Sequence, residues 1–172
     1  MAEGAIIARV LASPLEVDAT AWNALLALQS HPTPFMRHEY LVAMHESGSA
    51  TPKTGWTPRF VTLWKKGPAD LELVAACALY LKDHSYGEYV FDWAWAEAYQ
   101  RHGLDYYPKW LSALPFTPTP GTRILGRDLP ARRALLDAVL AQVRESGASS
   151  FHVLFPADDE RPLLACAGMM IR

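Results

Sequence analysis

The chain has 172 residues, of which 51% are apolar and 20% charged, and this is enough length for one domain with a sizeable core. Its formal net charge of −2 argues against a general polyanion binder, because such proteins are usually basic. No segment reaches the length of a membrane span, and no basic stretch followed by a long apolar run opens the chain. We therefore expect a cytoplasmic protein with a single domain over residues 1–172 and no membrane span.

The first half of the chain predicts one strand, two helices and a β-hairpin. Residues 5–12 are apolar and partly β-branched, which is typical of a strand. Asp18 can cap a helix over residues 19–29, and apolar residues recur at helical spacing across residues 35–47. Residues 49–58 are rich in threonine and proline and predict a loop. A hairpin follows, with its first strand, turn and second strand at residues 60–64, 65–70 and 71–81.

In the second half, the clearest signal is one long helix. Asp128 is placed to cap that helix, Pro130 lies in its first turn and Gly147 follows its end. The proline-rich residues 115–121 before it predict a stiff extended loop. The other predicted elements are a helix over 92–102, a strand over 109–114, a strand over 151–155, a short helix ending at 167 and the start of a strand at 168–172.

The cysteines and histidines form no recognisable metal or redox motif. Cys77 and Cys166 lie in separate apolar runs, so we expect two buried, reduced thiols. Only His38 and His45 can share a helical face, and the chain has no H-E-x-x-H motif. Neither a serine-nucleophile elbow nor a Rossmann or Walker loop is present. We expect no metal site and no tightly bound cofactor.

The predicted order of elements resembles that of the GNAT acetyltransferase fold. Both have one strand, two helices, an antiparallel hairpin, a strand, a long helix, a strand, a short helix and a final strand. Residues 163–169 also resemble the segment before the sixth strand of GNAT domains. The resemblance implies an α/β (α+β) domain whose mixed, mostly antiparallel sheet has helices on both faces. The chain departs from acetyl-CoA-dependent GNAT enzymes, because residues 119–127 lack the glycine spacing of their Arg/Gln-x-x-Gly-x-Gly/Ala loop.

A long aromatic run over residues 84–110 is more specific, since it holds nine of the 19 aromatic residues. Within it, HSYGEYVFDWAW at 84–95 and YYPK at 106–109 resemble a signature of the FemAB-like predicted N-acyltransferases, as does PFTP at 115–118. Three shorter segments also fit that family: PF at 34–35, ESGS at 46–49 and TGW at 54–56.

Members of this bacterial family look like two GNAT-type lobes in one chain. The resemblance implies that residues 1–172 are the N-terminal lobe, inactive alone, with an open sheet edge that favours a homodimer. The implied activity is transfer of an acyl or aminoacyl group to an amine acceptor in cell-wall peptide metabolism. The donor would be acyl-CoA or aminoacyl-tRNA, and we favour the latter. The alternative function is a non-catalytic module that recognises a peptidoglycan-like peptide or glycan through an aromatic cleft.

Acyl transfer to an amine requires a base and a means of positioning two reactants. Glu88 and Asp92 are candidate bases, because burial among aromatic residues raises a carboxylate pKa. Alternatively, Asp92 is a helix N-cap, Glu88 lies on the surface and most of the aromatic residues fill a core. The candidate substrate-binding residues are His84, Tyr86, Tyr106, Tyr107, Lys109, Phe116 and Thr117. We expect these nine residues to converge on one side of the domain, with the three tyrosines partly exposed.

Four arginines flank Asp128 at the start of the long helix. Arg123, Arg127 and Arg132 are candidates for binding the phosphates of the donor, beside the free N–H groups of the helix. The alternative is a solvated basic surface. Because the Asp128 carboxylate caps the same N–H groups and repels anions, we expect only weak phosphate binding.

Overall fold

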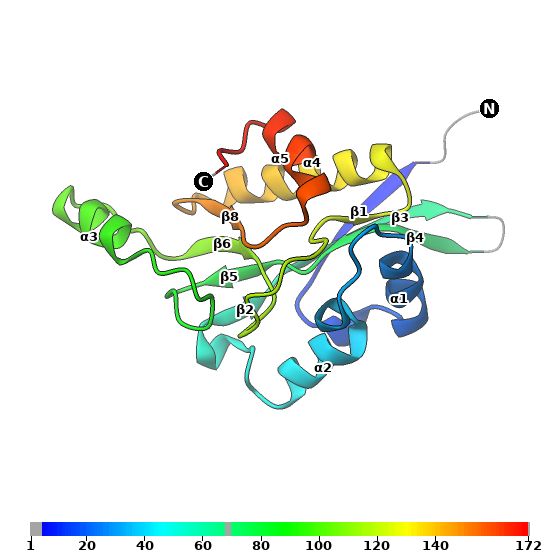
Figure 1. Ribbon diagram of the computed structural model, residues 1–172, viewed down its shortest axis with the longest axis horizontal. Coiled ribbons are helices and arrows are strands. Elements are labelled where there is room, and N and C mark those ends of the chain that lie inside the picture. Colours follow the sequence, from blue (N-terminus) through cyan, green and yellow to red (C-terminus); the bar gives the residue numbers. More distant parts are fainter. Residues whose placement is uncertain (1–4, 68–69, 172) are drawn as a thin grey trace.

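Two four-stranded sheets with helices on both sides make up the fold (Figure 1). The computed structural model describes residues 5–67 and 70–171. Among these residues the sheet orders are β1-β3-β4-β7 and β2-β5-β6-β8, and of the strand pairs only β6–β8 is parallel. The strands are β1 Ile6–Leu11, β2 Trp56–Pro58, β3 Phe60–Lys66, β4 Leu71–Cys77, β5 Tyr80–Lys82, β6 Lys109–Ser112, β7 Leu125–Gly126 and β8 Phe151–Val153. The helices are α1 Ala19–Ala27, α2 His38–Glu46, α3 Trp93–Arg101, α4 Leu129–Ser146 and α5 Arg161–Cys166.

One long, bent β-hairpin joins the two sheets. Its first arm is β2 followed by β3 and its second is β4 followed by β5, so that β3 pairs with β4 and β2 with β5. The N–H of Arg59 donates to the carbonyl of Leu79 at 2.8 Å, which continues the pairing through the bend. Pro58 has no N–H to offer a regular ladder at this point, which favours the bend. The prediction of one strand over 71–81 is therefore wrong, because the chain bends at residues 78–79 and passes from one sheet to the other.

Some other predicted boundaries also differ from the structure. The predicted loop over 49–58 ends in strand β2, and the predicted helix over 35–47 is a 3-10 turn followed by α2. The two helical pieces are separated by Arg37, which is extended, and the N–H of His38 donates to Asn23 Oδ1 at 3.0 Å instead of continuing a helix.

Two of the predicted segments reach residues outside the described ranges. The turn over 65–70 is closed by a hydrogen bond from the Gly67 N–H to the Asp70 carbonyl at 2.7 Å, and residues 68 and 69 lie outside the described residues. The predicted strand over 168–172 does not form at residues 169–171, and Arg172 lies outside the described residues. Strand β8 also stops at Val153, two residues earlier than predicted.

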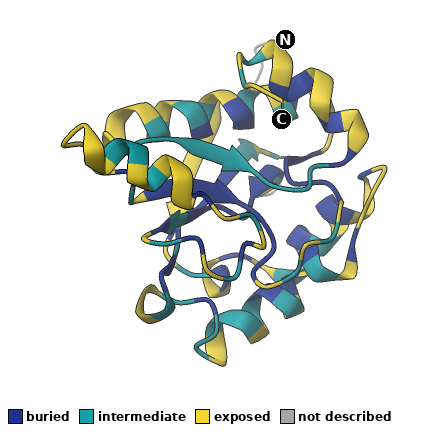
Figure 2. Ribbon diagram, turned by 60° about the vertical axis from the view of Figure 1, so that its left-hand side comes forward, coloured by how far each residue is buried: buried dark blue, intermediate teal, exposed yellow. Residues whose placement is uncertain are grey.

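The core has two layers, one on each face of the sheets (Figures 1 and 2). On one face α1 and α2 pack against the sheets, and Trp22, Leu25 and Leu26 of α1 are buried there. On the other face lie α4 and α5, and α4 buries Leu135, Leu136 and Val139. In both helices the buried residues recur at the three- to four-residue spacing of one helical face. The predicted mixed sheet with helices on both faces is confirmed.

Helix α4 begins and ends as its sequence predicts. The Asp128 Oδ1 accepts a hydrogen bond from the Ala131 N–H at 2.8 Å, and Pro130 lies in the first turn. Gly147 ends the helix with φ of 67°, a left-handed conformation that costs glycine little. The helix therefore lies along one face of the sheets and leads directly into β8.

We predict that Leu135→Ala lowers the free energy of unfolding by about 2–5 kcal/mol, because it leaves a cavity under α4. Urea unfolding monitored by circular dichroism measures the change. The matched control is Leu129→Ala in the first turn of the same helix, where the side chain is exposed and the change should be small. Equal losses in the two variants would contradict the packing described for α4.

Candidate active site

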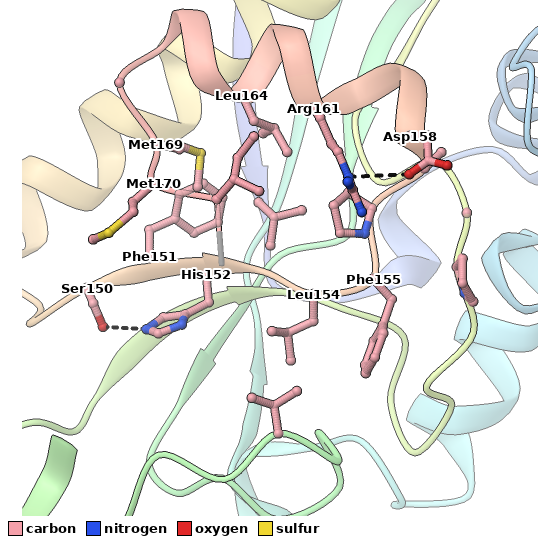
Figure 3. A pocket seen from close by; sticks show the side chains of 18 of the residues that line it. Ser150, Phe151, His152, Leu154, Phe155, Asp158, Arg161, Leu164, Met169 and Met170 are labelled. Carbon is pink, nitrogen blue, oxygen red and sulfur yellow. Dashed lines mark hydrogen bonds and ion pairs between the residues drawn. The ribbon is translucent and has the colours of Figure 1, made fainter. Parts of the chain in front are cut away.

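A cavity of about 880 Å³ runs along β8 (Figure 3). Residues 150–158 line one side of it, and helix α5 with residues 168–171 lines the other. The middle is apolar, with Phe151 and Leu164 facing one another across the cavity. Polar and charged side chains gather at its two ends: Ser150 and His152 at one, Asp158 and Arg161 at the other. Asp92 also lines the cavity and interacts electrostatically with His152.

Strand β8 has a free edge that borders this cavity, since it is the last strand of its sheet among the described residues. On its paired edge the Ser150 carbonyl accepts from the Trp110 N–H at 2.8 Å, and the Leu154 N–H donates to the Ser112 carbonyl at 3.0 Å. Because backbone groups alternate along a strand, Phe151 and Val153 direct theirs to the other edge. The cavity therefore offers a ligand backbone donors and acceptors as well as side chains.

A buried ion cluster lies behind the polar end of the cavity. The Lys109 Nζ donates to Glu88 Oε2 at 2.7 Å and to Asp92 Oδ2, and it lies 3.4 Å from the Ser85 hydroxyl. Lys109, Glu88 and Asp92 are exposed by only 1%, 2% and 5%. Lys109 comes from the start of β6, and the two carboxylates come from the loop that leads into α3. The cluster therefore ties the base of α3 to the sheet.

The two carboxylates differ in the direction of their pKa shift and in access to the cavity. Burial raises the pKa of Glu88, and the Lys109 ammonium offsets this only in part. Burial also acts to raise the pKa of Asp92, but Lys109, the Tyr106 hydroxyl and His152 together hold that pKa below its usual value. Asp92 lines the cavity, whereas Glu88 does not. Asp92 is therefore the ionised carboxylate that a ligand meets, and Glu88 positions Lys109 from behind.

This geometry rules out the simpler alternative for the two acids. The Asp92 side chain makes no capping hydrogen bond to α3, although it stands at the N-cap position. Glu88 is buried rather than on the surface, and its Oε1 has no hydrogen-bond partner among the described residues. Both side chains are committed to Lys109 instead.

A second buried lysine, Lys82, lies next to this cluster and was not predicted from the sequence. Its Nζ lies 3.9 Å from the centroid of the Trp56 ring and donates to the Tyr86 carbonyl at 3.2 Å. Burial lowers its pKa to about 8, and Glu88 and Asp83 limit that shift. The available signal in the sequence was a lysine at the end of an apolar strand. Lysine is almost never buried unless it is paired, so a lysine at that position predicts a nearby partner.

His152 is the main site residue that the sequence analysis missed. It lies in β8, and its Nε2 is 2.9 Å from the Ser150 hydroxyl and 3.3 Å from the Tyr106 hydroxyl (Figure 3 draws the contact with Ser150). A polar residue in the middle of the apolar segment 151–155 was the signal that pointed to it. With Asp92, it makes the polar end of the cavity a place where a proton can be accepted.

The tyrosines lie at different depths, contrary to the expectation that all three are partly exposed. Tyr106 is buried, and that burial, together with Asp92, raises the pKa of its phenol. Tyr107 is half-buried and its hydroxyl lies 2.7 Å from the Ser85 hydroxyl. Tyr86 is exposed, and its ring packs on His84 with centroids 5.1 Å apart. Tyr106 therefore belongs to the site, Tyr107 supports the Lys109 cluster through Ser85, and Tyr86 lies outside it.

The remaining predicted substrate-binding residues lie away from the cavity. The Phe116 N–H donates to the Gly87 carbonyl at 3.0 Å, and its ring approaches Trp56 with centroids 5.8 Å apart. The Thr117 hydroxyl lies 2.8 Å from the hydroxyl of Tyr40 in α2. Neither residue lines the cavity, and neither does His84, so the structure gathers only part of the predicted set.

The predicted phosphate-binding arginines do not form one exposed site. Arg123 is fully buried, and its guanidinium donates to the carbonyls of Leu154, Gly121 and Thr119. Arg132 donates to Glu160 at 3.3 Å and to the Ile124 carbonyl at 3.0 Å. Arg127 is exposed and pairs with Glu72 at 3.4 Å.

The buried carboxylate of Glu160 explains this arrangement. It accepts hydrogen bonds from the backbone N–H groups of Arg123, Ile124 and Ala157, at distances from 2.7 to 3.1 Å. Arg123 and Arg132 therefore complete a structural network around the start of α4, which argues against their direct contact with a donor phosphate.

Other site classes receive no support from the described residues. Cys77 is buried, but Cys166 is exposed, which corrects the expectation of two buried thiols: Cys166 ends α5 on its outer side. Residues 5–67 and 70–171 contain no group of three or more histidine, cysteine, aspartate or glutamate side chains placed to hold a metal ion. No helix in these ranges is long and apolar enough to cross a membrane.

Comparison with known proteins identifies the fold and then the family. The structure is similar to that of an acetyltransferase from Trypanosoma brucei, with a TM-score of 0.52 and 11% sequence identity over 98% of this chain and 94% of that one. The expected GNAT-like fold is thereby confirmed. Residues 13–172 match the FemAB-like family, which is described by its role in peptidoglycan biosynthesis/recognition, and the chain belongs to this family. No curated protein sequence matches it.

We predict that Lys109→Met lowers the free energy of unfolding by about 3–5 kcal/mol at neutral pH, because two buried carboxylates lose their counter-ion. In the native protein Asp92, whose pKa is lowered, contributes stability above the unfolded aspartate pKa and loses it as the pH falls through its folded pKa. In the variant both carboxyls take up protons more readily, so its deficit should shrink at about pH 5. Urea unfolding at the two pH values measures this.

The control is Arg101→Met, which breaks the exposed ion pair with Glu97 and should change stability little at either pH. A Lys109→Met protein as stable as the native one at neutral pH would contradict the electrostatic role of the cluster.

Proposed function

We propose that this chain is an acyltransferase lobe that binds a primary amine at Asp92 and passes its proton to His152. The observation that carries the proposal is that an ionised carboxylate and an imidazole meet at one end of a cavity in a GNAT-like fold. A carboxylate attracts the ammonium form of an amine, and an imidazole accepts a proton near neutral pH. These are the two tasks that direct transfer to an amine requires.

In the proposed step the amine nitrogen attacks the carbonyl carbon of an activated acyl group. The bond from that carbon to the donor's sulfur or oxygen breaks, and an amide forms. An amine bound as the ammonium first gives one proton through the Ser150 hydroxyl to His152, whose Nε2 lies 2.9 Å from that hydroxyl, and His152 releases this proton to solvent. The second proton, which the nitrogen loses as the amide forms, follows the same route and passes from His152 to the leaving group. Asp92 remains ionised, because Lys109 stabilises its charge throughout.

The rest of the cavity fits an acyl donor. The apolar side chains of Phe151 and Leu164 would contact an acyl chain, and the backbone N–H groups at the free edge of β8 would donate to its carbonyl oxygen. We propose acyl-CoA or aminoacyl-tRNA as donor. Because Arg123 and Arg132 are committed to Glu160 and to carbonyls, Arg127 is the one exposed arginine among the three that were predicted to bind a donor phosphate.

The family description also covers recognition, and the acceptor we propose is the amine of a cell-wall peptide. A module that only recognises such a peptide would bind it without binding any donor. Calorimetric titration with acetyl-CoA, with aminoacyl-tRNA and with a soluble stem peptide that has a free amine separates the two functions.

We predict that Asp92→Asn raises KM for the stem peptide about 10- to 100-fold, because it removes a charge-assisted hydrogen bond to the amine. His152→Ala should instead lower kcat by about 10²- to 10⁴-fold, because it removes the proton acceptor. Mass spectrometry of the amide product gives both constants, and calorimetry gives the affinity of Asp92→Asn for the peptide independently of turnover.

Matched controls are Asp137→Asn on the outer side of α4 and His102→Ala after α3, both exposed and outside the cavity. They should leave kcat and KM unchanged. The proposal fails if Asp92→Asn and His152→Ala bind the peptide and turn it over as the native protein does.

A further inference from the structure

A serine and a histidine lie side by side at the polar end of the cavity along β8. The Ser150 hydroxyl lies 2.9 Å from His152 Nε2, and Figure 3 draws this contact. Because Ser150 directly precedes β8 and His152 lies within it, their side chains are two positions apart and leave the same face of the chain. Both residues line the cavity and both are half-buried, so a ligand in the cavity can reach the hydroxyl.

The Ser150 hydroxyl has a second neighbour that is less suited to take its proton. The Ser149 hydroxyl lies 3.3 Å away, and it donates its own proton to the Tyr106 carbonyl. The contact with His152 is the shorter of the two, and an imidazole nitrogen is a far stronger base than a hydroxyl. The Ser150 hydroxyl is therefore hydrogen-bonded to a group that can deprotonate it as it attacks a carbonyl carbon.

Two neighbours of His152 can stabilise the imidazolium that forms when it takes a proton. The Tyr106 hydroxyl lies 3.3 Å from the same Nε2, and its oxygen can accept a hydrogen bond once that nitrogen holds a proton. Asp92 interacts electrostatically with His152, and its negative charge stabilises a cation nearby. His152 is therefore equipped to take the proton of Ser150 and to hold it until a leaving group departs.

We propose that Ser150 is a nucleophile, with His152 as its general base, and that the chain hydrolyses activated acyl esters when no amine is bound. This activity is distinct from the proposed direct transfer to an amine, in which the serine hydroxyl only relays protons. It rests on one part of the proposed function, the binding of an acyl donor in the cavity along β8. Its substrates are thioesters and esters with a good leaving group.

The reaction has two halves that share one covalent intermediate. In the first, Ser150 Oγ attacks the acyl carbon and its proton moves to His152 Nε2. The bond from that carbon to the leaving oxygen or sulfur breaks, the leaving group takes the proton from His152, and an ester of Ser150 remains. In the second, a water molecule attacks the same carbon and gives a proton to His152. The bond from the carbon to Ser150 Oγ breaks, this oxygen takes the proton back, and a carboxylic acid is released.

The residues beside the serine suit an acyl ester. The N–H of Phe151, which directly follows Ser150, is directed to the edge of β8 that borders the cavity. There it can donate to the carbonyl oxygen on which negative charge develops. The side chains of Phe151 and Leu164 line the apolar middle of the cavity and fit a short acyl chain. The nucleophile, the base and an oxyanion donor thus come from the three consecutive residues 150–152.

Acylation by p-nitrophenyl acetate in amine-free phosphate buffer tests the proposal. The native chain should release a burst of about one equivalent of p-nitrophenolate, and mass spectrometry of its peptides should find an acetyl group on Ser150. Ser150→Ala should show no burst, and His152→Ala should form the acetyl-serine about 10²- to 10⁴-fold more slowly. The matched control is Ser47→Ala after α2, which removes an exposed hydroxyl outside the cavity and should leave the burst unchanged.

The same measurement separates this activity from the proposed transfer, because it contains no amine. A native chain that releases p-nitrophenolate no faster than Ser150→Ala overturns the proposal, and so does an acetyl group found only on other residues. Acetyl-serine formed by a chain that makes no amide with the stem peptide supports the nucleophile and contradicts the direct transfer. Amide made by a chain that forms no acetyl-serine has the opposite meaning.

Discussion

The buried ammonium of Lys109 is the interaction on which the candidate site depends. A lysine in the core is unfavourable unless it is paired, and here two carboxylates and a hydroxyl surround it. Both carboxylates come from the loop before α3. Because they pair with the Lys109 ammonium on β6, the ion pairs also fix the path of that loop. They place Asp92 at the cavity and keep it ionised. One ion cluster thus links the sheet, the base of helix α3 and the chemistry proposed for the cavity.

The bent hairpin provides the second constraint. Because β4 and β5 belong to different sheets, their outer edges pair with different strands, β7 and β6. The chain between β6 and β7 is then free to loop outward. The buried carboxylate of Glu160 anchors this loop where it returns to the fold, by accepting from the N–H groups of residues 123 and 124. The same carboxylate also fixes the segment after β8 that lines the cavity. The bend in the hairpin and the buried Glu160 therefore both shape the walls of the cavity.

The sequence pointed to three residues that the structure brings together, and the physical reason is clear. Glu88, Asp92 and Lys109 stand out as charged residues within a dense aromatic run, and such residues must find partners when the run is buried. Arg123 and Arg132 misled the analysis, because a group of arginines beside a helix start looks the same whether it faces solvent or a buried acid. The acid concerned, Glu160, lies 37 residues beyond Arg123. His152 was overlooked because a histidine gives no local signal of its contacts with Tyr106, 46 residues away.

The sequence by itself determined the elements whose signals are local. The capped helix α4, the apolar faces of α1 and α4 and the order of strands and helices follow from residue spacing and end signals. The aromatic run indicated the family. Tertiary structure alone decided where the hairpin bends and which carboxylate reaches the cavity. It also decided that Arg123 and Arg132 are occupied while the aromatic rings of Phe91 and Trp93 remain exposed. Those outcomes depend on burial and on pairing between residues distant in the chain, and no local sequence pattern determines how exposed a side chain is in the folded protein.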